Sequence, residues 1–226
     1  MVEFISATRL TKEAFWERSA LGLSLRRMEF DERWVPRVAF ENTRGLSTVF
    51  NERIATPSEH DILVFMHDDV WIDAPFVVDH LERALQEFHV VGVVGNDQRV
   101  PRQFAWAFVN ITRDVVWDDT GHLHGAIAHA PHAMGPVTRF GDTPAECELM
   151  DGVFLAARRS VLQRYGVAFD ERFSFHFYDL DFCRTARSRG LLLGTWPIAL
   201  THQSHGNWRS DEWMRSYGEY IAKWKE

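Results

Sequence analysis

Two runs of apolar residues have the length of buried β-strands, Ile62–Met66 and residues 90–94. Between them, apolar residues recur at helical spacing after Pro75, which suits the first turn of a helix. These apolar positions are Phe76, Val77, Leu81, Leu85 and Phe88. The order strand, helix, strand predicts a βαβ crossover, and therefore a parallel sheet with helices on its faces.

Similar patterns predict the elements on either side of this unit. Thr11 is expected to cap a helix that begins at Lys12. Pro36 places its strand at an edge of the sheet, and Gly190 suits the end of a helix. Strands are expected at residues 4–8, 34–40, 153–157, 191–196 and 198–201, and helices at residues 46–54, 160–165, 179–189 and 211–225.

The pattern changes between residues 95 and 148. Short β-like pieces at residues 104–111, 115–117 and 122–127 are separated by turn signals. This segment is expected to form a small antiparallel insertion that contributes to substrate binding. The predicted fold is therefore α/β, with a mostly parallel central sheet flanked by helices.

The composition is that of a globular chain. It has 226 residues, of which 46% are hydrophobic and 25% charged, which fits one domain over residues 1–226. The formal net charge of −7 leaves no general basic field for nucleic acid or an anionic membrane. The nine Trp and seventeen Phe are many for this length, and aromatic side chains fill cores or stack on ring-shaped ligands.

Cys147 and Cys183 are too few for a disulfide framework and are expected to be free thiols in a reducing compartment. The N-terminus lacks the basic segment and the long apolar run of a signal peptide. No apolar stretch approaches the ~20 residues that a bilayer span needs. We therefore expect a cytoplasmic protein without a membrane span, for which peripheral membrane contact and oligomeric state stay open.

Three polar residues, His67, Asp68 and Asp69, directly follow the first apolar strand. In open α/β sheets, ligands bind outside the carboxyl ends of the strands. Two carboxylates and an imidazole there are costly unless a positive charge offsets them. A divalent cation does so, and it can also bridge the phosphate oxygens of a nucleotide. Capping of the following helix explains the two acids equally well on location alone.

Two further clusters carry candidate chemistry. Asp179 and Asp181 lie at a predicted helix start, where either could be a general base or simply interact with the helix dipole. His202 and His205 follow a late strand and are candidate metal ligands. The sequence has eleven His, but it contains neither CxxC nor HExxH, which argues against a zinc site. Motifs of the GxGxxG, Walker A and G-x-S-x-G types are also absent.

Taken in order, these residues resemble glycosyltransferase family 2-like enzymes of the GT-A fold. The closest resemblance is to a bacterial branch whose acid motif reads His-any-Asp-Val, which is residues 67–70 here. The other matches are Asp151-Gly152 before an apolar strand, Phe169-Asp170-Glu171, the helix start at residues 178–183, and His202 followed by Gly206. The resemblance extends from Phe4 to His205 and rests on five motifs in the correct order.

The resemblance implies a GT-A fold, a nucleotide-sugar donor of the UDP, GDP or dTDP type, a divalent cation (Mn²⁺ or Mg²⁺), and inversion by direct displacement. By position, the implied metal ligands are Asp69, His202 and His67, the last in place of the usual first acid. The implied base is Asp179, with Asp181 as the alternative. The implied nucleotide contacts are Thr8, Arg9, Asn42, Asp68 and Asp69, and the donor or acceptor sugar contacts are Asp151, Gly152, Tyr178 and His205.

The leading hypothesis is therefore a metal-dependent inverting glycosyltransferase that acts on a glycan or glycolipid acceptor. A sugar-nucleotide nucleotidyltransferase is the nearest enzyme alternative, although residues 4–11 lack its Gly-rich loop. A non-catalytic carbohydrate-binding domain that keeps the fold is the alternative from another class. Trp106, Trp117 and Trp208 can stack on acceptor sugars, but core packing is the commoner role for any one Trp.

Overall fold

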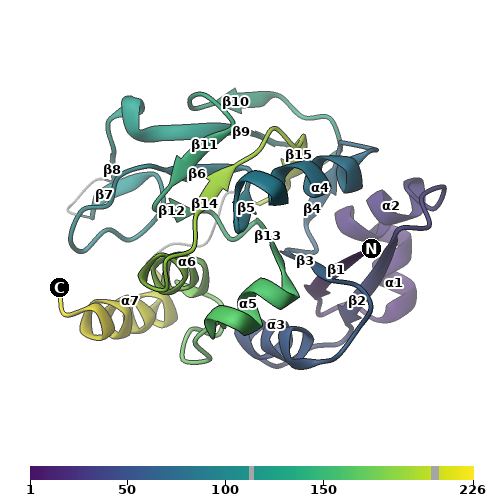
Figure 1. Cartoon of the computed structure of the whole chain (residues 1–226), viewed down its shortest axis with the longest axis horizontal. Coiled ribbons are helices and arrows are strands. Elements are labelled where there is room, and N and C mark those ends of the chain that lie inside the picture. Colours follow the sequence, from purple (N-terminus) through teal and green to yellow (C-terminus); the bar gives the residue numbers. More distant parts are fainter. Residues whose placement is uncertain (112–114, 205–208) are drawn as a thin grey trace.

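A seven-stranded sheet runs through the middle of the computed structural model, which describes residues 1–111, 115–204 and 209–226 (Figure 1). Its order is β11 (Ala145–Cys147), β14 (Leu193–Thr195), β5 (Val90–Gly92), β13 (Phe154–Arg158), β3 (Ile62–Met66), β1 (Val2–Ala7) and β2 (Trp34–Ala39). Five of these strands run in one direction, and only β13 and β11 oppose them. The predicted parallel character is therefore confirmed, and so is the edge position of the strand that contains Pro36.

A second sheet adjoins the first. Its order is β12 (Leu149–Met150), β6 (Val94–Asn96), β9 (Leu123–His129), β15 (Leu200–His202) and β4 (Val70–Ile72), with β10 (Val137–Arg139) paired to β9. A separate antiparallel hairpin consists of β7 (Phe108–Ile111) and β8 (Val115–Trp117). The antiparallel insertion predicted between residues 95 and 148 supplies most of these strands.

Seven α-helices are described, and they cover both sides of the large sheet. They are α1 (Lys12–Arg18), α2 (Ala20–Arg27), α3 (Leu46–Ala55), α4 (Val77–Glu87), α5 (Arg159–Tyr165), α6 (Tyr178–Ser188) and α7 (Asp211–Trp224), with a 3₁₀ turn at Thr120–His122. Figure 1 shows α4 on one side of the sheet and α3, α5 and α6 on the other. Within the described residues, no helix is both long and apolar enough to cross a membrane.

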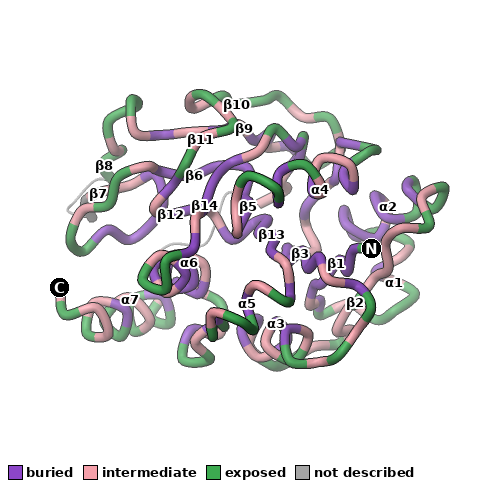
Figure 2. Tube along the Cα trace, viewed as in Figure 1, coloured by how far each residue is buried: buried purple, intermediate pink, exposed green. Residues whose placement is uncertain are grey.

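The buried parts of the chain follow the central strands (Figure 2). All five residues of β3 are buried, as expected for a strand covered on both faces. The single strand predicted at residues 90–94 is instead two strands, β5 and β6. The chain leaves the first sheet at Val93, whose carbonyl accepts a hydrogen bond from the Ala126 amide of β9. The following strand, β6, therefore belongs to the second sheet. The crossover from β3 through α4 to β5 keeps both strands parallel, but β13 lies between them.

Helix boundaries follow the local capping signals. The Thr11 hydroxyl accepts a hydrogen bond from the Ala14 amide at 3.3 Å, which confirms it as the N-cap of α1. Ser19 then ends α1 and caps α2, because its hydroxyl accepts from the Gly22 amide at 2.9 Å. Gly190 follows α6 with a φ of +82°, a left-handed conformation that glycine adopts readily.

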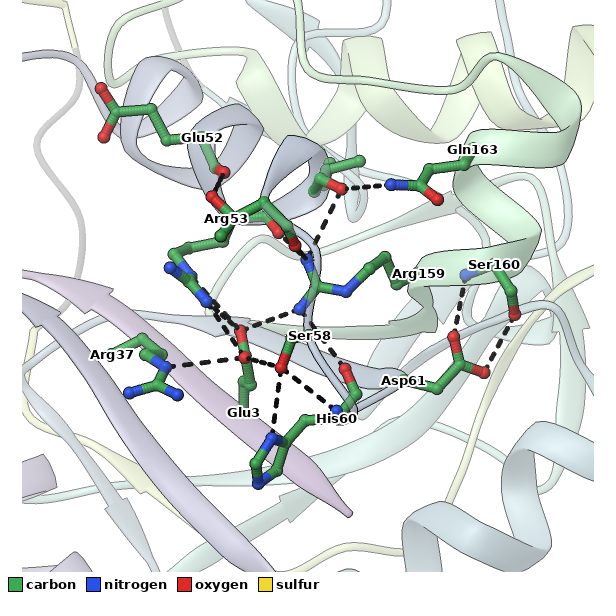
Figure 3. Close-up of polar contacts among 12 residues, drawn as sticks. Glu3, Arg37, Glu52, Arg53, Ser58, His60, Asp61, Arg159, Ser160 and Gln163 are labelled. Carbon is green, nitrogen blue, oxygen red and sulfur yellow. Dashed lines mark hydrogen bonds and ion pairs between the residues drawn. The ribbon is translucent and has the colours of Figure 1, made fainter.

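Glu3 is the centre of a buried ion cluster that joins β1 to α3 and α5 (Figure 3). Its fully buried carboxylate lies 3.0 Å from both Arg53 and Arg159 and accepts a hydrogen bond from Ser58 at 2.8 Å. Burial alone would raise the pKa of Glu3, but the Ser58 hydroxyl and the arginines outweigh it and lower that pKa. Arg37 reaches the same carboxylate at 3.5 Å from a more exposed position.

Arg159 has a second function in this cluster. Its guanidinium donates to the carbonyls of Arg53 and Thr56, the latter at 2.6 Å, at the C-terminal end of α3. Helix ends leave such carbonyls without intrahelical partners, and a cation there also interacts favourably with the helix dipole. Arg159 therefore neutralises Glu3 and caps α3 at the same time.

We predict that Arg159→Leu lowers the free energy of unfolding by about 3 kcal/mol or more, because it leaves a buried carboxylate with less compensating charge and removes a helix cap. Arg37→Ala is the matched control and should cost less than about 1 kcal/mol, since this arginine is 40% exposed. Urea unfolding followed by circular dichroism measures both changes. Equal losses in the two variants would contradict this account of the cluster.

Candidate metal centre and catalytic cavity

Three potential metal ligands converge where the two sheets meet. His67 follows β3, Asp69 precedes β4, and His202 ends β15. The antiparallel pairing of β15 with β4 places His202 opposite Val70 and therefore beside Asp69. One ligand atom from each of the three residues lies within 4.8 Å of the others, with His202 Nε2 at 3.3 Å and His67 Nδ1 at 3.9 Å from Asp69 Oδ1.

The chemistry of these atoms fits a divalent cation. Asp69 Oδ1 and His202 Nε2 are buried, and neither has a hydrogen-bond partner among the described residues. Buried polar atoms rarely stay unsatisfied, so such a pair calls for a further group between them. One carboxylate and two imidazoles suit Mn²⁺ and related transition metals better than Mg²⁺, which prefers oxygen ligands.

A hydrogen-bond chain fixes the orientation of His67. The Tyr178 hydroxyl donates to the Gly152 carbonyl at 2.8 Å. Its single proton is thus engaged, so the Tyr178 oxygen accepts from His67 Nε2, also at 2.8 Å. This network assigns the proton of His67 to Nε2 and leaves the Nδ1 lone pair directed to the side of Asp69. Such an outer partner is typical of metal-binding histidines.

Burial and neighbouring charges act differently on the pKa values of the three proposed ligands. Burial lowers the pKa of His67, which favours the neutral imidazole that a metal requires. Burial also acts against charge on His202, but the adjacent Asp69 carboxylate outweighs it and raises the pKa of His202. Burial would raise the pKa of Asp69, but the interaction with His202 outweighs it and lowers that pKa. Without a metal, His202 and Asp69 thus stabilise each other as an ion pair, and a cation bound to both would displace the proton of His202.

A pair of acids lies beside this centre. The Asp179 carboxylate, at the start of α6, accepts from the Gly152 amide at 2.9 Å. Asp151 accepts from Trp106 Nε1 and from the Val153 amide, both at 2.8 Å. Burial and the negative charge of Asp151 together raise the pKa of Asp179 to about 7. A carboxylate with that pKa is suited to proton transfer near neutral pH.

The metal ligands and the acids open on one cavity of about 450 Å³. Its polar end contains His67, Asp69, Asp151, Asp179 and His202. Its lining also includes aromatic residues of the insertion, among them Trp106, Trp117 and Phe140. The volume lies in the range of small-molecule sites, about 300–1,000 Å³.

The residues predicted to contact a nucleotide lie around the ends of β1, β2 and β3. Arg9 is exposed, whereas Thr8 is buried and its carbonyl accepts from the Asn42 amide at 2.8 Å. The Asn42 side chain closes a turn with the backbone of Arg44. Burial raises the pKa of Asp68, although the Thr8 hydroxyl opposes that shift. Asp68 is thus next to Asp69 in sequence but does not line the cavity with it.

Asp181 does not line the cavity. Its fully buried carboxylate binds Lys223 at 2.7 Å and Trp224 Nε1 at 3.0 Å, which attaches α7 to α6. Residues two apart on a helix point in different directions, so only one of Asp179 and Asp181 can face the cavity. His205 and Trp208 lie outside the described residues.

Two contributions to the site were not predicted from the sequence. His129 lines the cavity because β9 pairs in parallel with β15, which places it opposite His202, with ring centroids 5.7 Å apart. Tyr178, predicted as a sugar contact, lines the cavity, and its hydrogen bond with His67 was not predicted. The sequence contains eleven His, and only the strand register singles out His129 among them.

The chain has a mixed α/β fold that matches GT-A glycosyltransferase structures, with a mostly parallel central sheet flanked by helices. Comparison of the sequence with protein-family models and with curated proteins finds no match. The resemblance to known proteins is therefore one of structure, and it supports the fold predicted from the ordered motifs.

Three of the similar structures illustrate the likeness in fold at low sequence identity. Staphylococcus aureus TarS, residues 1–349, has a TM-score of 0.53 and 12% identity, covering 98% of this chain and 64% of TarS. GalNAc-T7 with UDP, GalNAc and Mn²⁺ has a TM-score of 0.54 and 9% identity, covering 98% and 48%. The mannosyltransferase PcManGT from Pyrobaculum calidifontis, with GDP-Man and Mn²⁺, has a TM-score of 0.50 and 13% identity, covering 99% and 64%. This chain thus spans less than two thirds of each.

We predict that Tyr178→Phe weakens Mn²⁺ binding by about tenfold or more, because it removes the acceptor that orients His67. Asp69→Ala, which removes a ligand outright, should weaken binding further. Tyr165→Phe is the control, since Tyr165 lies at the end of α5 and does not line the cavity. Calorimetric titration with Mn²⁺ alone measures the series. Wild-type affinity in Tyr178→Phe would exclude the proposed support of His67.

Proposed function

We propose that this chain is a metal-dependent inverting glycosyltransferase. It would move a sugar from a nucleotide-diphosphate donor of the UDP, GDP or dTDP type to a hydroxyl of a glycan, glycolipid or other acceptor. The observation that carries the proposal is the opening of the His67, Asp69 and His202 cluster and of Asp179 on one cavity of a GT-A fold.

The metal ligands account for departure of the nucleotide. His67, Asp69 and His202 would hold a divalent cation, which supplies positive charge to the diphosphate as it leaves. No lysine or arginine is among the described residues that line the cavity, so those residues offer no other strong positive charge. Mn²⁺ in the GalNAc-T7 and PcManGT structures supports this assignment.

Asp179 accounts for activation of the acceptor. In its ionised form it would take the proton of the attacking hydroxyl while the bond to the anomeric carbon forms and the bond to the diphosphate breaks. The Gly152 amide donates to one carboxylate oxygen and so holds the side chain in place. A single displacement of this kind inverts the anomeric centre, because the acceptor attacks opposite the leaving group.

The arrangement favours this function over a binding domain that only retains the fold. A buried carboxylate with a purely structural role is expected to pair with a cation, as Asp181 does with Lys223. Asp179 instead lies near a second carboxylate at the wall of a cavity, which raises its pKa. Such placement of an acid is typical of catalytic sites.

We predict that Asp179→Asn lowers kcat by about 10²–10⁴-fold, because the amide cannot accept the proton, while nucleotide binding in the presence of Mn²⁺ is retained. Asp181→Asn is the matched control. It should lower stability through loss of the Lys223 ion pair but retain turnover within a few fold. Turnover is measured as nucleotide release in the presence of acceptor, and binding by calorimetry. Wild-type turnover in Asp179→Asn would exclude Asp179 as the base.

We also predict that kcat/KM rises with pH and levels off above about pH 7. Burial and Asp151 raise the pKa of Asp179 to about 7, and only the ionised carboxylate can act as a base. Below that pKa the rate should fall about tenfold for each pH unit. Rates between pH 5.5 and 9 at saturating Mn²⁺ measure this profile, with Mn²⁺ affinity determined at each pH as the control. A flat profile would contradict the assigned base.

A further inference from the structure

The aromatic wall of the cavity contains two tryptophans with different surroundings. Trp106 is only 9% exposed, its indole NH is bound to Asp151, and its ring meets Phe140 edge-on at 4.9 Å. Trp117, on β8, is 53% exposed although it also lines the cavity. Trp106 is therefore a packed residue that positions Asp151, whereas Trp117 has ring surface available to a ligand.

Neighbouring rings hold Trp117 in place. Phe108, its partner across the β7–β8 hairpin, contacts it edge-on with ring centroids 4.5 Å apart. Phe140 lies nearly parallel to it at 6.0 Å. These contacts leave more than half of Trp117 exposed, so the ring forms a supported, flat platform at the wall of the cavity.

The charges of the cavity limit what can bind on that platform. Its described lining residues include Asp69, Asp151 and Asp179 but neither lysine nor arginine. Asp118, next to Trp117 in sequence, has a lowered pKa because hydrogen bonds from Asn96 and others outweigh its burial, and it adds negative charge. Apart from the proposed metal, which would bind the donor diphosphate, the described lining residues offer an anionic ligand on this wall no positive side chain, and the carboxylates would repel it.

The polar groups also argue against a purely apolar ligand. Such a molecule would remove water from Asp151 and Asp179 without replacing the lost hydrogen bonds, at considerable cost. An uncharged sugar can interact favourably with both the aromatic and the carboxylate side chains of the cavity. Its C–H face can lie on the electron-rich face of an indole, and its hydroxyls can donate to the carboxylates.

We infer that the acceptor is an uncharged sugar whose ring stacks on Trp117, which makes Trp117 a specificity-determining residue. This inference rests on the proposed glycosyltransferase function. It excludes uronic acids and phosphorylated sugars at the position that stacks on Trp117.

The test uses the whole chain and needs no donor. Neutral trisaccharides of glucose, galactose, mannose and N-acetylglucosamine are titrated while tryptophan fluorescence and ligand-observed NMR are recorded. Each is compared with its counterpart that carries a uronic acid or a 6-phosphate. We expect at least one neutral probe to bind, and its charged counterparts to bind at least tenfold more weakly.

Variants separate stacking from general effects. Trp117→Ala should weaken binding of the neutral probe about tenfold, and Trp117→Phe should restore most of that loss. Phe76→Ala is the matched control, because Phe76 is 59% exposed and is not among the described lining residues. Folding of each variant is verified by thermal unfolding.

The inference is overturned if no neutral probe binds, if charged probes bind equally well, or if Trp117→Ala binds like the wild type. Calorimetry of UDP, GDP and dTDP with Mn²⁺ on the wild-type chain tests the proposed function separately. Absence of metal-dependent nucleotide binding would contradict that function. Nucleotide binding without selection of neutral sugars would contradict only the inference about the acceptor.

Discussion

The backbone of Gly152 is the constraint on which the site depends. Its amide donates to Asp179 at 2.9 Å, and its carbonyl accepts from Tyr178, which in turn accepts from His67. A Cβ atom at Gly152 would lie 2.4 Å from the Tyr178 hydroxyl, so no larger residue fits without moving α6. One backbone unit thus sets the position of the proposed base and the orientation of a proposed metal ligand, and it links the ends of β3, β13 and α6.

The fold contains two buried polar clusters that differ in how far they are satisfied. Around Glu3, two arginines and a serine pair with the carboxylate, and Arg159 also caps a helix. In the cavity, by contrast, Asp69 and His202 each present a buried atom without a hydrogen-bond partner among the described residues. The Glu3 carboxylate is thus fully paired and stabilises the fold, although Arg159 Nε has no hydrogen-bond partner among the described residues, whereas the unpaired ligand atoms at the cavity retain the capacity to bind. This contrast supports the proposed metal-binding role of the cavity cluster.

The sequence predicted those parts of the fold that depend on local signals. The apolar run of β3, the Thr11 cap and the edge strand with Pro36 were all predicted correctly. The split at Val93 and the short strand β4 were missed, because both depend on pairing with the distant strands β9 and β15. Non-local pairing is not recorded in the periodicity of either segment.

The candidate site shows the same division. The motifs predicted that Asp69, Asp179 and His202 belong to one site. Only the strand register shows that His202 lies beside Asp69 and that His129 lies opposite His202. Helical geometry could have separated Asp179 from Asp181 in advance, since residues two apart do not share a helix face. Which of the two faces the cavity depends on α7, whose Lys223 binds Asp181.

Site and scaffold also respond to pH in opposite directions. Glu3 has a lowered pKa, so its contribution to stability is present above the unfolded value of about 4.3 and is lost as pH falls through the folded pKa. Asp179 has a raised pKa, so the folded state binds the extra proton, and stability decreases as pH rises from about 3.9 toward about 7. The ionised form of Asp179 that the proposed reaction needs is therefore the less stable one. The ion pairs of Glu3, whose lowered pKa keeps the carboxyl ionised near neutral pH, help the fold to tolerate it.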